Sequence, residues 1–147
     1  MDIIHVQNGT FDKYFSATEF FHINGKSYFI GISEDGSYRI YPIDKTGVIL
    51  EKKIISEGKV ETNIYDLNVI KDTYNGYIYL YIINSEQTLI SLYTITDNLT
   101  LELSYSLRSN VRKVAGMFYI VNNNLFQYRQ SSTTKAWKIH QFNINSQ

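Results

Sequence analysis

The chain has 147 residues, of which 44% are hydrophobic and 15% aromatic, and its 14 basic residues equal its 14 acidic residues. This length and apolar content predict one folded domain over residues 1–147 rather than a disordered chain. The neutral net charge argues against nucleic acid or an acidic membrane surface as a partner. The absence of cysteine excludes a disulfide framework and any chemistry that needs a thiolate.

No targeting or membrane-spanning segment is visible. Residues 1–6 lack a basic region and a long apolar stretch, so no secretory signal is expected. The longest nearly apolar run, residues 77–83, is far shorter than the ~20 residues that a membrane helix needs. We therefore expect a soluble protein without membrane insertion, with the cytoplasm as its default location.

The apolar residues are of the kinds that favour strands. The chain contains 13 Tyr and 8 Phe but a single Pro, and aromatic and β-branched residues suit a pleated, half-buried surface. The sequence predicts a short strand at Ile3–Val6 and another at residues 14–23. Ser16 and Glu19 are spaced as in a helix capping box, but Phe20 and the residues after it run directly into an Asn-Gly turn, which favours the strand.

The later strands alternate with turns rich in Gly, Asp, Asn and Ser. Strands are first predicted at residues 26–32, 38–43 and 48–55, with turns at 34–36 and 44–47 and a separating segment at 56–59. They follow at residues 64–70, 77–83, 89–93 and 99–103, with turns at 72–76, 84–88 and 96–98. The last are predicted at residues 111–114, 115–121, 125–128 and 137–144, with turns at 122–124 and 131–134.

One pattern occurs three times: a Gly stands three residues ahead of a Tyr in an apolar run, and a polar turn and a second apolar run follow. The pairs are Gly25 and Tyr28, Gly76 and Tyr79, and Gly116 and Tyr119. The domain therefore divides into approximate repeats at residues 14–55, 64–107 and 111–144, each with about four strands. Repeats of about 40 to 50 residues have the length of a propeller blade.

These repeats resemble the blades of β-propellers, in which Gly-x-x-Tyr-aliphatic, a polar turn and an aliphatic–aromatic strand recur once per blade. The resemblance covers residues 14–144 and implies an all-β fold of three four-stranded antiparallel repeats. Propeller rings typically have 4 to 8 blades, so three blades would leave two open apolar faces, which soluble monomers rarely tolerate. Two copies would close a ring, with Ile3–Val6 completing a last blade, and we therefore expect a homodimer.

A β-trefoil is the alternative architecture. It also has three four-stranded repeats, and it suits a chain of this length as a closed monomer. Trefoil repeats often carry a Gln-x-Trp pattern near their ends, and the nearest match here, Lys135-Ala136-Trp137, lacks the Gln. The sequence therefore favours the propeller-like arrangement.

No pattern of catalytic or metal-binding residues stands out. The three histidines, His5, His22 and His140, are scattered and have no metal-ligand spacing. There is no Gly-x-Ser-x-Gly and no phosphate-binding Gly-rich motif. The carboxylates within predicted turns are explained by hydrogen bonds to the backbone, and the basic residues in 108–113 by a solvated connection. We predict no enzyme activity, no catalytic or metal-binding residue, no cofactor and no nucleic-acid partner.

Aromatic residues near strand ends are the best candidates for a binding surface. Tyr and Trp offer rigid apolar faces with a polar group, which suits both protein contacts and the stacking of sugar rings. An Arg beside such a Tyr can supply hydrogen bonds. The predicted ligand-binding residues are Tyr38, Arg39, Tyr93, Tyr128, Arg129 and Trp137.

The predicted function is that of a non-catalytic binding module. Its preferred partner is another protein, either a second copy of the chain or a member of a larger assembly. A lectin-like protein that binds carbohydrate is the alternative within the binding class. A propeller-type hydrolase, with catalytic residues around the ring axis, is the alternative from another class.

Overall fold

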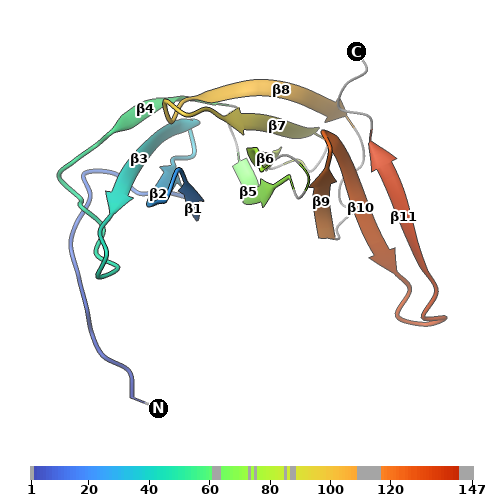
Figure 1. Cartoon of the computed structure of the whole chain (residues 1–147), viewed down its shortest axis with the longest axis horizontal. Coiled ribbons are helices and arrows are strands. Elements are labelled where there is room, and N and C mark those ends of the chain that lie inside the picture. The colour runs from blue at the N-terminus through green and yellow to red at the C-terminus, as the bar shows by residue number, and fades with distance from the viewer. Residues whose placement is uncertain are drawn as a thin grey trace.

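Figure 1 shows the computed structural model of the chain, which describes residues 2–60, 64–72, 74, 76–84, 86, 89–108 and 117–142. Every regular element in these ranges is a β-strand, and the strands form three antiparallel sheets. The all-β prediction is therefore confirmed. The part of the chain that the structure describes contains no helix long and apolar enough to cross a membrane.

Within each sheet, strands that follow one another in the sequence are neighbours. Sheet 1 contains β1 (Ala17–Ile23), β2 (Lys26–Ile32), β3 (Ser37–Ile43) and β4 (Ser56–Lys59). Sheet 2 contains β5 (Ile64–Lys71), β6 (Ile78–Asn84), β7 (Leu89–Ile95) and β8 (Leu101–Arg108). Sheet 3 contains β9 (Met117–Val121), β10 (Asn124–Gln130) and β11 (Trp137–Phe142).

The three sheets form an arc (Figure 1). The first strand of each sheet, β1, β5 or β9, lies on the concave side, and the last strand, β4, β8 or β11, lies on the convex side. The sheets are open, and no ladder among the described strands closes them into the barrel of a β-trefoil. The strand predicted at 111–114 lies outside the described residues.

Two hairpins turn through residues in the left-handed conformation. The β1–β2 turn has φ of 53° at Asn24 and 76° at Gly25, and the β9–β10 turn has φ of 51° at Asn122 and 64° at Asn123. Two consecutive left-handed residues give the turn whose twist matches that of the flanking strands. Asn and Gly adopt this conformation more readily than other residues. The turns predicted at these positions are confirmed, as is the strand, rather than a helix start, in residues 14–23.

The fourth strand of sheet 1 is not where the sequence predicts it. Residues 48–55 form no strand, and β4 lies in the polar segment predicted as a separator. Ile49 packs on one face of sheet 1 and Ile55 on the other, so this segment crosses the sheet edge instead of following β3. Gly58 allows β4 to lie beside β3 and under the Tyr38 ring. A Cβ at residue 58 would lie only 2.7 Å from the hydroxyl oxygen of Tyr38, which is too close for a larger residue.

The strand predicted at Ile3–Val6 is also wrong. Residues 2–10 have no regular structure, and the side chain of Ile3 is 98% exposed. No described strand pairs with this segment. Its apolar residues therefore lack the partner that a strand needs.

Each sheet has a front face, which carries the repeated Tyr, and a rear face. The Tyr residues of the front faces are Tyr28 in sheet 1, Tyr79 in sheet 2 and Tyr119 in sheet 3. The next residues along the strands, Phe29, Leu80 and Ile120, lie on the rear faces. The front face of sheet 1 packs on the rear face of sheet 2, and the front face of sheet 2 packs on the rear face of sheet 3.

These two contacts, junction 1–2 and junction 2–3, form most of the core. In junction 1–2 the fully buried side chains of Ile30 and Ile40 meet that of Leu80. In junction 2–3 Leu92 of sheet 2 meets Ile120 and Leu125 of sheet 3. Burying an aliphatic or aromatic side chain of this size contributes about 1.5–3 kcal/mol. Apolar burial at these two junctions thus holds the three sheets together in the order in which they occur along the chain.

Candidate functional site

The six predicted ligand-binding residues lie in three separate places. Tyr38 and Tyr93 are each only 6% exposed and belong to the apolar cluster of junction 1–2. Their rings pack between sheet 1 and sheet 2, and the Tyr38 ring also covers Gly58 of β4. These two tyrosines have too little exposed surface to form a platform for a ligand.

Arg39 lies on the rear face of sheet 1, where it holds the segment that precedes β1. Its guanidinium donates hydrogen bonds to both carboxylate oxygens of Asp12, at 2.5 and 3.3 Å, and to the hydroxyl of Tyr41 at 3.4 Å. The hydrogen bond from Arg39 holds the pKa of the exposed Asp12 carboxyl below its usual value, and the same bond raises the pKa of Arg39. This Arg is occupied by a contact within the chain.

The rear face of sheet 1 is covered by aromatic residues from the same segment. Phe11 and Phe15 pack on Phe29 and Tyr41, with ring centroids 5.0–6.1 Å apart. Gly31 leaves room for this cover, because a Cβ there would lie 2.4 Å from the Phe15 ring. Residues 11–15 therefore cover the centre of this rear face.

The other three predicted residues, Tyr128, Arg129 and Trp137, come together in sheet 3. Tyr128 and Trp137 stack on the front face with ring centroids 6.3 Å apart. Arg129 follows Tyr128 on β10, pairs with Lys138 of β11 and, with Trp137, lines a hollow at the β10–β11 hairpin. The structure thus brings half of the predicted residues together, and their role in binding stays a prediction.

The front face of sheet 3 is larger than this pair. Its described positions carry no charged residue; they are Tyr119, Val121, Asn124, Phe126, Tyr128, Gln130, Trp137, Ile139 and Gln141. Tyr119 and Phe126 form a second stacked pair, with centroids 5.3 Å apart. Trp137 is 61% exposed and Ile139 is 49% exposed. No described sheet packs on this face, so the surface is apolar, aromatic and open.

Sequence reasoning missed Tyr119, Phe126 and Ile139 as members of this face. The candidates were sought near strand ends, whereas Tyr119 lies within the strand predicted at residues 115–121. The period-two alternation of Trp137 and Ile139 with Lys138 and His140 does indicate a one-sided apolar strand. The sequence does not show that the neighbouring sheet is lacking on that side.

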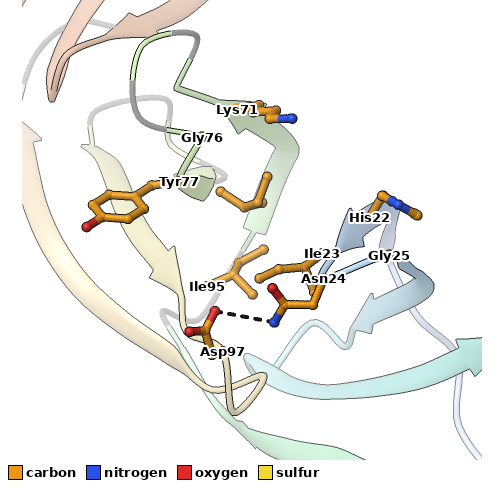
Figure 2. A pocket seen from close by; sticks show the side chains of 10 residues that line it. His22, Ile23, Asn24, Gly25, Lys71, Gly76, Tyr77, Ile95 and Asp97 are labelled. Carbon is orange, nitrogen blue, oxygen red and sulfur yellow. Dashed lines mark hydrogen bonds between the residues drawn. The ribbon is translucent and has the colours of Figure 1, made fainter.

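A pocket opens between sheet 1 and sheet 2, where the β1–β2 and β7–β8 turns meet the β5–β6 connection (Figure 2). Asn24 faces Asp97 there, with 3.5 Å between the amide nitrogen and the carboxylate oxygen. His22 and Lys71 lie apart from that pair and from each other (Figure 2). None of the six predicted residues lines this pocket. Its described side chains place no nucleophile beside a general base.

Asp72 is a buried carboxylate at the start of the turn predicted at residues 72–76. It is fully buried and lies where β5 meets the β9–β10 turn. Its carboxylate accepts hydrogen bonds from the backbone N–H groups of Tyr74, Asn122 and Asn123 at 2.8–2.9 Å. The Tyr79 hydroxyl donates to the side-chain oxygen of Asn123 at 3.0 Å. This network joins sheet 3 to sheet 2, and we assign it to structure rather than to ligand binding.

Among the described residues, no group of three or more His, Cys, Asp or Glu could hold a metal ion. Comparison of the chain with known protein families and with curated proteins finds no match to either. The front face of sheet 3 is therefore the candidate functional site on its own geometry.

Proposed function

We propose that the chain is a binding module that docks on another protein through the front face of sheet 3. The observation that carries the proposal is the exposure of Trp137 and Ile139 on an uncharged face that also holds two stacked aromatic pairs. The front faces of sheets 1 and 2 are each covered by the next sheet, and this one is not. Trp and Tyr dominate the contacts that contribute most to protein–protein affinity.

The architecture that fits this proposal is part of a propeller-like ring. The sheets have four, four and three described strands, follow one another front to rear, and lie in an arc (Figure 1). A ring has no open front face, whereas an arc must have one. Docking at sheet 3 would supply the missing neighbour.

The proposal is tested by site-specific cross-linking in the source cell. A photoreactive phenylalanine analogue replaces Trp137 in one variant and Leu103 in a control, because Leu103 of β8 is similarly exposed, at 55%, but lies outside the face. We expect protein adducts of defined mass from position 137 and none from position 103. Equal labelling at both positions, or none at either, would contradict docking through sheet 3.

Carbohydrate is the second candidate ligand, and the hollow at the β10–β11 hairpin favours it. The hollow is lined by the exposed Trp137 together with Arg129, Gln130 and Thr134. An aromatic ring with polar groups at its edge is the surface that stacks on a sugar. Trp137 is the only Trp among 13 Tyr, so tryptophan fluorescence, excited at wavelengths that tyrosine does not absorb, reports on this place alone. A saturable fluorescence change with a free sugar, lost in Arg129→Ala, would favour the lectin over protein docking.

A further inference from the structure

The partner that covers the front face of sheet 3 can be argued one step further, on the basis of the proposed function. We infer that it is a second copy of this chain, which presents the rear side of its sheet 1, with residues 11–20, to that face. The contact is front to rear, like the two junctions within the chain, and it occurs twice in a closed dimer.

The first support is the front-to-rear direction in which the sheets pack at the two internal junctions. Both join the front face of one sheet to the rear face of the next. Sheet 3 carries its Tyr at the matching position, Tyr119, with Phe126 stacked beside it on the exposed side. The front face of sheet 3 is therefore built like surfaces that receive a rear face elsewhere in the molecule.

The second support is the surface at the other end of the arc. Phe11 and Phe15 cover the centre of the rear face of sheet 1, but they do not cover all its aromatic residues. Phe20, which pairs with Phe29 on β2, is 56% exposed, and Tyr14 is 83% exposed. The rear side of sheet 1 thus still presents apolar rings to solvent, as a receiving surface for sheet 3 requires.

The third support is the arrangement of the two ends. The front face of sheet 3 and the rear face of sheet 1 lie at opposite ends of the arc, and the first strand of every sheet lies on the concave side (Figure 1). A contact between two different surfaces of the same chain gives a ring when its rotation closes and a filament when it does not. The curvature of the arc favours closure.

The fourth support is the distribution of charge, which disfavours the contact of two sheet 3 faces with each other. The described residues of sheet 3 and its hairpins, 117–142, contain three basic and no acidic residues, whereas residues 2–60 contain eight acidic and seven basic residues. Two identical basic ends would repel each other when brought together. When the basic sheet 3 end meets the nearly neutral sheet 1 end of another copy, this repulsion is absent.

The test begins with absolute mass by light scattering over a wide range of protein concentration. We expect the unaltered chain to reach twice its mass of 17.1 kDa. Ile139→Lys breaks the front face of sheet 3 and Phe20→Glu breaks the rear side of sheet 1, so each variant alone should remain at the single-chain mass. Trp137→Lys provides a second break of the sheet 3 face. Leu103→Lys, at a similarly exposed position on β8, should keep the doubled mass.

Mixing the variants distinguishes the contact of unlike surfaces from that of like surfaces. An equal mixture of Ile139→Lys and Phe20→Glu retains one intact front face and one intact rear side, so the doubled mass should return. This recovery also shows that both variants are folded. If Phe20→Glu alone keeps the doubled mass, the contact is between two sheet 3 faces, and the inference is overturned.

The inference and the proposed function can fail separately. A chain that stays at 17.1 kDa at every concentration overturns the second copy as partner. Cross-linking from position 137 to a different protein would then leave docking through sheet 3 standing. If the mass stays single and position 137 gives no adduct, both are overturned.

Discussion

Junction 1–2 is held by apolar side chains and contains no buried charged group among the described residues, whereas junction 2–3 combines apolar side chains with the buried carboxylate of Asp72 and the buried amide of Gln127. At junction 1–2 the polar contact between the sheets is at the rim, where Asn24 and Asp97 lie 3.5 Å apart and are exposed. At junction 2–3 the polar contact is made by the fully buried Asp72, which binds the turn of the neighbouring sheet.

This difference shows that junction 2–3, more than junction 1–2, fixes the orientation of one sheet relative to its neighbour. Apolar burial is non-directional and tolerates small rotations of one face on another. Two hydrogen bonds from the β9–β10 turn to the Asp72 carboxylate set that turn at a defined place. Sheet 3 carries the proposed docking face, so Asp72 determines where that face points.

The largest expected effect is that of removing the Asp72 carboxylate. Asp72→Ala removes a fully buried carboxylate and leaves three backbone N–H groups without this acceptor, so it should lower the free energy of unfolding by about 4 kcal/mol. Urea denaturation measures the loss. Hydrogen exchange should show that the amides of β9 and β10 lose more protection than those of β2.

Asp97→Ala is the matched control for this variant. Asp97 is an exposed carboxylate at the rim of the other junction, and its loss should change the free energy of unfolding by less than about 0.5 kcal/mol. Equal losses from Asp72→Ala and Asp97→Ala would show that the buried carboxylate does not distinguish the junctions.

The apolar part of the two junctions should respond alike. Leu80→Ala removes a fully buried side chain from junction 1–2, and Leu125→Ala removes one that is 1% exposed from junction 2–3. Each cavity should cost about 3 kcal/mol. Chemical denaturation of both variants checks this. A much smaller loss at Leu125 would mean that sheet 3 is held mainly by Asp72.

Tyr81, in junction 2–3, should make the free energy of unfolding depend on pH, by up to about 2–3 kcal/mol. Burial raises the pKa of Tyr81 from 10.0 to about 12, and Asn68 donates a hydrogen bond to its hydroxyl at 2.9 Å. The folded state therefore holds the phenol proton more tightly than the unfolded chain does. The resulting stability is present below pH 10 and is lost as the pH rises from 10 through 12.

Tyr81→Phe isolates this contribution from the other tyrosines of the chain. The variant has no phenol at position 81, so its free energy of unfolding should fall less steeply than that of the unaltered protein above pH 10. Denaturation at a series of alkaline pH values measures the difference between the two proteins. Parallel curves would contradict a buried, neutral phenol in junction 2–3.

The strands with apolar runs were predictable because their own apolar residues indicate that they are buried. Strands β2, β6 and β7 are nearly continuous apolar segments between turn residues, and all three were predicted. Strand β4 was missed because its sequence, Ser-Glu-Gly-Lys, carries no apolar pattern. Its position depends on pairing with β3 and on the Tyr38 ring over Gly58, which are tertiary contacts.

The candidate site was only partly predictable for the same reason. Trp137 and Tyr128 stand out as aromatic residues beside a hairpin, and the structure brings them together. Tyr38 and Tyr93 are also aromatic residues near predicted strand ends, yet a neighbouring sheet buries them. Which face of a sheet is covered depends on the next sheet in space, and the alternation of a strand does not reveal that.

The smallest expected effect is a gain in stability at Gln127. Its side chain is 1% exposed in junction 2–3, and its amide nitrogen has no hydrogen-bond partner among the residues that the structure describes. Gln127→Met keeps a similar length and removes the unpaired donor, so the free energy of unfolding should rise by about 1 kcal/mol. Thermal and urea denaturation detect a change of this size. A loss at Gln127→Met would mean that the amide stabilises junction 2–3, in which case polar anchoring of sheet 3 extends beyond Asp72.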